Sequence, residues 1–167
     1  MQKVHHPRDN WRDVVFGGIV LLVVLADQLT KAWIRSNLTL GQSVGDVGFF
    51  RILHVYNTGA SFGLFKEYAF TLLIIDIIGI VVIIILVFLL RSRWSFYDSM
   101  LVRVGTALIT GGTIGNLVDR IRLGHVTDFL DFKVWPVFNV ADASAVVGTI
   151  IVAFCLIFLM KSVDKEE

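Results

Sequence analysis

Four long apolar runs constrain the fold of this 167-residue chain more than any other feature. They lie at about residues 14–34, 68–90, 100–118 and 140–160, and each is long enough to cross about 30 Å of hydrocarbon as a helix. Hydrophobic residues make up 56% of the chain and its mean hydropathy is +0.76, as in integral membrane proteins. We therefore expect an all-α membrane protein with four transmembrane helices, forming one domain over residues 1–167.

Charged and aromatic residues at the span ends indicate the orientation of the chain. Four crossings place both termini on the same side of the membrane, and basic residues adjoin the spans on that side, including Arg91, Arg93 and Lys161. We expect both termini in the cytoplasm. The tryptophans support the span boundaries, because indole rings prefer the headgroup level; they are Trp11, Trp33, Trp94 and Trp135.

The first apolar run also has features of a secretory signal peptide. Lys3, Arg8 and Arg12 precede an apolar stretch from Val14 to Ala26, which ends in an acceptable cleavage sequence. Cleavage there would remove a helix and leave three spans. The apolar pattern resumes beyond this point, which favours an intact first helix.

The segment at about 36–67 is the sizeable extramembrane piece of the predicted topology. It contains several glycines, and Phe49 to Tyr56 is rich in residues that favour strands. We expect a small β-sheet platform on the extracytoplasmic side, between the first and second helices and lying on the bilayer. Asn57, which follows, either belongs to a plain turn or presents its amide to a peptide backbone.

Costly polar side chains gather at one predicted face of the membrane. Asp128 and Asp142 flank the start of the fourth span, and two acids held close together can share a proton and activate a water against an amide. Polar groups at this depth need a partner, water or a function. The convergence is typical of a site; its members are Asp27, Asn57, Asn116, Arg120, Asp128, Asn139 and Asp142.

These groups also have structural interpretations. Asp27 and Lys31 are one helical turn apart, so they can form an ion pair that anchors other polar groups. Asp142 falls in the first turn of a helix, where the helix dipole favours a negative charge. Asp119 and Arg120 could form a surface pair.

Glycines accompany the polar side chains of the third span. Gly111 and Gly115 form a pair of small residues four apart, which suits close helix packing. Gly112, Asn116 and Arg120 fall on one stripe of the helix. A glycine beneath an asparagine and an arginine makes room for something to enter.

Several other chemistries are poorly supported. His54 and His125 could ligate a metal with Asp128, but the sequence has no second histidine at helical ligand spacing, and we expect no metal or other cofactor. Ser61 and Ser144 lack a nearby general base. The net charge of +1 argues against a nucleic-acid partner.

Two rival functions come from other classes. A small proton-coupled transporter would also carry acids in a helix bundle, but nearer the midplane, as only Asp76 does here. The role of Asp76 stays open. A non-enzymatic scaffold could use the glycine-rich third span, yet it gives no reason for two paired aspartates. Cys155, in an apolar run, is interpreted as a small packing residue.

Five short blocks, in this order and spacing, resemble the lipoprotein signal peptidases (signal peptidase II), which are aspartyl peptidases of the bacterial inner membrane. The resemblance covers nearly the whole chain, and the combination of five blocks is highly specific. One departure is Ser61, where the family more often has alanine, a change of one small residue for another. The blocks are Asp27–Lys31, Asn57–Phe62, Gly115–Arg120, Val126–Phe129 and Phe138–Asp142.

The resemblance implies that Asp128 and Asp142 form a catalytic dyad. It implies a substrate, a prolipoprotein that carries diacylglycerol on its lipobox cysteine and is cleaved on the amino side of that cysteine. It further implies inhibition by globomycin and an active site at the outer face of the cytoplasmic (inner) membrane, among membrane lipids. Residues around the substrate would be Asn57, Gly59, Gly112, Asn116, Arg120 and Asn139, with polar support from Asp27, Gln28, Lys31 and Asp119.

The expected mechanism needs no covalent intermediate. One carboxylate acts as general base on a water, while the other, protonated, polarises the scissile carbonyl. Like charges at close range cannot both ionise cheaply, so the pair should titrate as a unit. We assign Asp142, at a helix N-terminus, as the ionised partner and Asp128, in a loop, as the acid.

Overall fold

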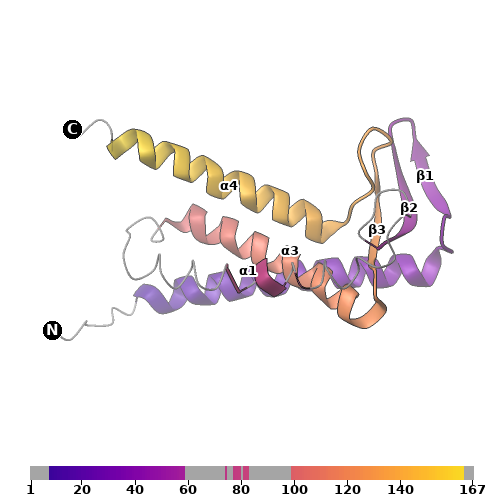
Figure 1. The fold of residues 1–167 in the computed structure, drawn as a ribbon, viewed down its shortest axis with the longest axis horizontal. Coiled ribbons are helices and arrows are strands. Elements are labelled where there is room, and N and C mark those ends of the chain that lie inside the picture. The colour runs from indigo at the N-terminus through magenta and orange to yellow at the C-terminus, as the bar shows by residue number, and fades with distance from the viewer. Residues whose placement is uncertain (1–7, 59–73, 75–76, 80, 83–98, 164–167) are drawn as a thin grey trace.

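The computed structural model describes residues 8–58, 74, 77–79, 81–82 and 99–163 of the chain. Three long helices run alongside one another, and a small sheet lies at one end of them (Figure 1). The start of α1 and the end of α4 lie at the opposite end from the sheet. The elements are α1 (Arg8–Asn37), β1 (Ser43–Val47), β2 (Phe50–Asn57), α3 (Met100–Leu123), β3 (Val126–Asp131) and α4 (Val140–Val163).

The apolar runs form helices because their length and composition suit a membrane span. Within the described ranges, three helices are long and apolar enough to cross a membrane: Trp11–Asn37, Met100–Leu123 and Val140–Ile157. By length and composition these helices agree with the first, third and fourth predicted spans. The helices α1, α3 and α4 each extend beyond the predicted bounds. Of the second predicted span, residues 74, 77–79 and 81–82 are helical. The rest of that span, including Asp76, lies outside the described residues, so the count of four spans stays a prediction.

Glycines on α3 let it lie between α1 and α4 (Figure 1). A Cβ atom at Gly111 would lie 2.8 Å from the Cβ of Val23 on α1, closer than side chains tolerate. On the other side, a Cβ at Gly105 would lie 2.8 Å from a methyl group of Val152 on α4. The predicted use of Gly111 in close helix packing is therefore confirmed.

The sheet is antiparallel with the strand order β1-β2-β3. Strands β1 and β2 lie in the segment where a sheet was expected. Strand β3 was missed, and Asp128, expected in a loop, is a strand residue paired with Val55. The sequence Val126–Asp131 contains two aspartates, which have low strand propensity. It becomes a strand because β2 offers an edge to pair with.

A backbone link joins β3 to the start of α4. Phe138 donates its N–H to the carbonyl oxygen of Leu130 (3.1 Å), and its own carbonyl accepts N–H groups from Phe129 (3.0 Å) and Leu130 (2.8 Å). The rings of Phe132 and Phe138 stack with centroids 5.8 Å apart. The chain therefore leaves β3, turns back and begins α4 beside the strand it left. This return brings Asn139 next to Asp128.

Candidate active site

Asn139 connects the two aspartates of the predicted dyad. Its side-chain Nδ2 donates to Oδ1 of Asp128 at 2.6 Å, and its backbone N–H donates to Oδ2 of Asp142 at 3.2 Å. Asn139 itself is completely buried. One residue thus holds both carboxyl groups, although they come from a strand and a helix.

Asp142 also caps the helix on which it lies. Its backbone N–H donates to Oδ1 of Asn139 at 2.9 Å, while its carboxylate accepts the backbone N–H of Asn139. This reciprocal pair is a capping box, which satisfies donors that a helix start leaves free. The helix-start interpretation of Asp142 is therefore correct, and it does not compete with a role in the dyad. The other oxygen, Oδ1, accepts a 2.7 Å hydrogen bond from Nδ2 of Asn116.

Asp128 is buried on β3, with 1% of its surface exposed. Its Oδ2 accepts a 2.8 Å hydrogen bond from Nδ2 of Asn57 on β2. Burial raises the pKa of Asp128 to about 7, and the nearby charge of Asp142 acts in the same direction. The hydrogen bonds from Asn57 and Asn139 lower this pKa but do not outweigh burial. Asp128 therefore keeps its proton to a higher pH than an ordinary aspartate does.

Asp27 and Lys31 form a fully buried ion pair, as their spacing predicted. Nζ of Lys31 lies 2.8 Å from Oδ2 of Asp27, and both side chains are 0% exposed. Oδ1 of Asp27 accepts the backbone N–H of Ala141 at 3.0 Å, so α1 supplies a second cap to the first turn of α4. This contact fixes the start of α4 against α1 and with it the position of Asp142.

Asp119 links α3 to α1 and to β3. It is buried, with 1% of its surface exposed, so its interpretation as part of a surface pair was wrong. Its Oδ2 accepts the backbone N–H of Thr127 at 3.0 Å, and Oδ1 accepts Nε2 of Gln28 at 3.2 Å. Because Thr127 precedes Asp128, this hydrogen bond fixes the start of β3, the strand that carries Asp128.

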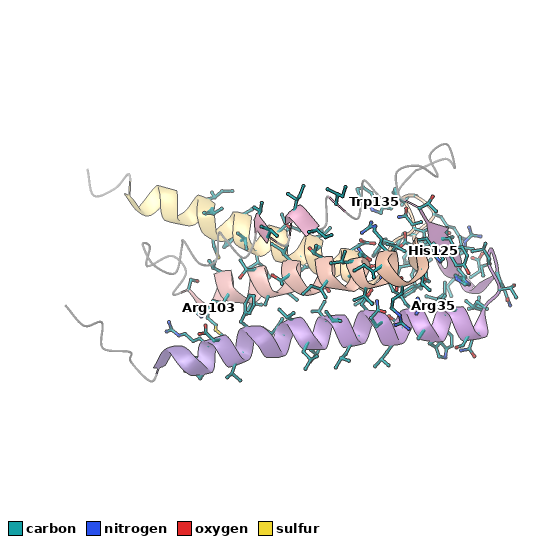
Figure 2. The ribbon with its side chains drawn as sticks, turned by 60° about the horizontal axis from the view of Figure 1, so that its bottom comes forward. Arg35, Arg103, His125 and Trp135 are labelled. Atoms are coloured by element: carbon teal, nitrogen blue, oxygen red, sulfur yellow. The ribbon has the colours of Figure 1, made fainter. Side chains whose placement is uncertain are left out.

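Arg35 was missed by the sequence reasoning. Its Nη1 lies 3.4 Å from Oδ1 of Asp119 and donates to Oγ1 of Thr127 at 3.0 Å. Figure 2 shows Arg35 and His125 at the sheet end of the helices. The signal was present in the sequence, since Arg35 continues the four-residue spacing of Asp27 and Lys31 along one helix face.

The remaining predicted site residues are placed as follows. A Cβ at Gly112 would collide with the carbonyl oxygen of Ala141, so in this structure the space above Gly112 holds the backbone of α4. Arg120 is half-buried, one turn beyond Asn116 on α3. Gly59 lies outside the described residues. Roles for these residues toward a substrate stay predictions.

His54 lies on β2, and His125 lies in the bend just before β3. Nδ1 of His54 is 2.8 Å from the carbonyl oxygen of Leu38, and the ring of His125 packs on Tyr56 with centroids 3.9 Å apart. In the part of the chain that the structure describes, no three His, Cys, Asp or Glu side chains converge as a metal site would require. The absence of a cofactor from the reaction stays a prediction.

Comparison with known proteins gives one consistent result. The family model described as signal peptidase (SPase) II matches residues 19–158. Lipoprotein signal peptidase of Dehalococcoides mccartyi (strain CBDB1) is 38% identical over 151 residues, which cover 90% of this chain and 92% of that protein. Lipoprotein signal peptidase of Moorella thermoacetica is 41% identical over 142 residues, covering 83% and 90%.

Solved structures agree with this result. A bacterial membrane enzyme solved by the in meso method at 1.9 Å resolution aligns with a TM-score of 0.74 and 28% identity, over 85% of this chain and 92% of that one. A second such structure, at 2.3 Å resolution, aligns with a TM-score of 0.73 and 29% identity, over 92% of each chain.

Proposed function

Because the chain belongs to the signal peptidase II family, a family of membrane peptidases that process prolipoproteins, we propose that it is an aspartyl endopeptidase with Asp128 and Asp142 as its catalytic dyad. It removes the signal peptide from prolipoproteins whose lipobox cysteine already carries diacylglycerol. Cleavage falls on the amino side of that cysteine.

The observation that carries this proposal is the double hydrogen bond of Asn139 to both aspartates. A purely structural acid at the start of α4 needs only the capping box. It gives no reason for a second carboxyl group, Asp128, to be buried beside it with the amides of Asn57 and Asn139, and no cation, as its hydrogen-bond partners among the described residues. Two neighbouring carboxyl groups that share one proton are the arrangement that aspartic peptidases use.

The two environments suggest how the acids divide the reaction. Asp142 accepts hydrogen bonds from two N–H donors and serves as the base, which takes a proton from water as the water oxygen attacks the scissile carbonyl carbon. Asp128, whose pKa lies at about 7, provides the proton that polarises the carbonyl oxygen. When the C–N bond breaks, Asp142 passes its proton to the leaving nitrogen, and the intermediate's hydroxyl proton returns to Asp128. Water is consumed and both acids are restored.

The position of the dyad fits a lipid-modified substrate. The start of α4 and strand β3 lie at the same end of the three apolar helices (Figure 1). Apolar side chains on the outer faces of these helices are exposed, including Leu22 and Leu29 of α1 and Ile150 of α4, as a lipid-facing surface requires. Diacylglycerol would lie among the helices, with the cysteine at the bilayer edge. We assign this edge to the outer face of the cytoplasmic membrane, with both termini inside.

Cleavage of a purified substrate tests the proposal. The protein is mixed with a diacylglyceryl prolipoprotein, and the shorter product is followed by gel electrophoresis. Asp128→Asn and Asp142→Asn should abolish cleavage, whereas Asp46→Asn, an exposed acid that pairs with Lys133 at 2.7 Å, should retain it. Near-normal turnover by Asp128→Asn would rule out the dyad.

Two further arms of the assay address the chemistry and the substrate. A globomycin-type inhibitor should stop cleavage, and a chelator should leave it unchanged; loss of activity with the chelator would contradict a metal-free reaction. The same prolipoprotein without diacylglycerol should not be cleaved. Equal cleavage of both forms would contradict the lipid requirement.

A further inference from the structure

Lys31 is a buried cation that is connected to Asp142 through the side chain of Asn116. Its Nζ donates to Oδ1 of Asn116 at 2.9 Å, in addition to pairing with Asp27 at 2.8 Å and lying 3.6 Å from Asp119. Asn116 in turn donates to Asp142. The lysine is therefore one side chain away from a catalytic carboxylate.

The ammonium group permits only one orientation of the Asn116 amide. A lysine ammonium has three donors and no acceptor, so only the amide oxygen of Asn116 can face it. Nδ2 must then point the other way, where Oδ1 of Asp142 accepts it at 2.7 Å. A flipped amide would set N–H groups against the ammonium and an oxygen against the carboxylate. Both contacts would be repulsive in a buried site.

The same reasoning orients the second amide. Oδ1 of Asn139 accepts the backbone N–H of Asp142 at 2.9 Å, which directs Nδ2 toward Asp128 at 2.6 Å. That Nδ2 also donates to Oδ1 of Asn116 at 3.1 Å, so the oxygen fixed by Lys31 receives a second donor. The two amides form one chain in which each places its N–H groups against a dyad carboxyl.

We propose that Lys31 is a positioning residue, whose ammonium fixes the amide of Asn116 so that the dyad always meets a hydrogen-bond donor on the Asp142 side. This inference rests on the proposed function and assigns Lys31 a part in turnover beyond its ion pair with Asp27. The charge of Lys31 adds a second effect, because it lowers the pKa of Asp128 against the effect of burial.

Lys31→Met tests the inference, because methionine keeps an unbranched apolar side chain and removes the charge and all three donors. We expect kcat to fall about 10- to 100-fold through loss of an oriented donor to a charged group, with KM changed less than about threefold. The alkaline limb of the pH profile should move to higher pH, because Asp128 keeps its proton longer without the positive charge.

Arg103→Met is the matched control. Arg103 is also a buried cation, 3% exposed, that joins α3 to α1 through a 2.9 Å contact with Asp13. It lies at the opposite end of the helices from Arg35 and the sheet (Figure 2). Both variants should lower stability, but only Lys31→Met should move the alkaline limb. Equal profiles for the two variants would reduce Lys31 to a structural role and overturn the inference.

A double-mutant cycle tests whether Lys31 acts through Asn116. In an Asn116→Ala background, Lys31→Met should lower kcat at the pH optimum by less than about threefold, because the amide it orients is gone. A full 10- to 100-fold loss in that background would show that Lys31 acts by another route and would refute the inference.

Two spectroscopic readouts do not depend on cleavage. The side-chain amide resonances of Asn116, identified by their loss in Asn116→Ala, should move in Lys31→Met. The infrared carboxylic acid band of Asp128, identified by its loss in Asp128→Asn, should titrate at a higher pH in Lys31→Met than in the wild type. If wild-type protein fails to cleave the substrate, the proposed function fails, while these signals still decide the role of Lys31. Unchanged signals overturn it.

Discussion

Gly115→Ala should loosen the buried ion pair on which the proposed dyad depends. A Cβ at position 115 would lie 2.7 Å from Oδ2 of Asp27, about 0.7 Å closer than the 3.4 Å at which ordinary contacts begin. That oxygen is the one that binds Lys31 at 2.8 Å. Moving it away by this amount would stretch the ion pair to about 3.5 Å, beyond good hydrogen-bond length.

The expected cost follows from two opposing terms. Overpacking in a tight interior costs about 1–3 kcal/mol, and alanine regains up to about 1 kcal/mol in helix propensity over glycine. We expect a net loss of about 1–2 kcal/mol in the free energy of unfolding. We also expect about tenfold lower kcat, because Asp27 no longer holds Lys31 and the Ala141 N–H in place.

Gly18→Ala on α1 is the matched control, because no described atom beyond its own stretch of helix lies within 4 Å of the Cβ it would gain. This variant gains the helix propensity of alanine without a steric clash, so its free energy of unfolding should be unchanged or slightly higher. Denaturant unfolding in detergent micelles and cleavage kinetics on the same samples measure both quantities. Equal stability and equal turnover of the two variants would refute the packing argument.

Three further predictions concern pH. The pKa of Asp128 is raised in the folded protein, so the stability that Asp128 contributes is full below about pH 3.8 and is lost as the pH rises through about 7. Asp128→Asn should therefore raise the melting temperature more at pH 8 than at pH 4. An equal rise at both pH values would contradict the raised pKa. Asn57→Ala removes a hydrogen bond that lowers this pKa, so the alkaline limb of kcat should move upward, which a pH–rate profile checks. The hydrogen bond from Arg51 lowers the pKa of Asp131. Arg51→Met should therefore lower the free energy of unfolding by roughly 1 kcal/mol or less at pH 7, and by still less near pH 3, as measured by denaturant titration. A loss that does not change with pH would indicate lost packing instead.

Much of the architecture could be predicted because it depends on local composition. The three described helices lie where the apolar runs predicted them, since a span needs only length and hydropathy. Strand β2 was expected from its strand-forming residues. Strand β3 could not be predicted in this way, because its two aspartates disfavour strands and its conformation depends on pairing with β2.

The candidate site divides in the same way. The sequence alone determined that acids and amides from separate segments would meet at one end of the helices, because each is too costly to leave unpaired in or near lipid. It also gave the Asp27–Lys31 pair through helix spacing. Taken alone, Asp142 fitted a helix cap as well as a dyad, and only its company and the family resemblance favoured the dyad. Arg35 was missed.

Only the tertiary structure showed that Asp142 caps α4 and that Arg35 contacts Asp119 and Thr127. The catalytic role of Asp142 stays our proposal. Asn139 caps α4 and reaches Asp128 because the chain doubles back from β3 along the Leu130–Phe138 link, a contact between backbones that no local pattern encodes. The amide of Asn116 points its donor at Asp142 because Lys31 of another helix occupies its other end. The sequence determined most of the polar groups that meet at this end of the helices. The three-dimensional packing determined which way each of them points, since hydrogen-bond direction depends on neighbours distant in the chain.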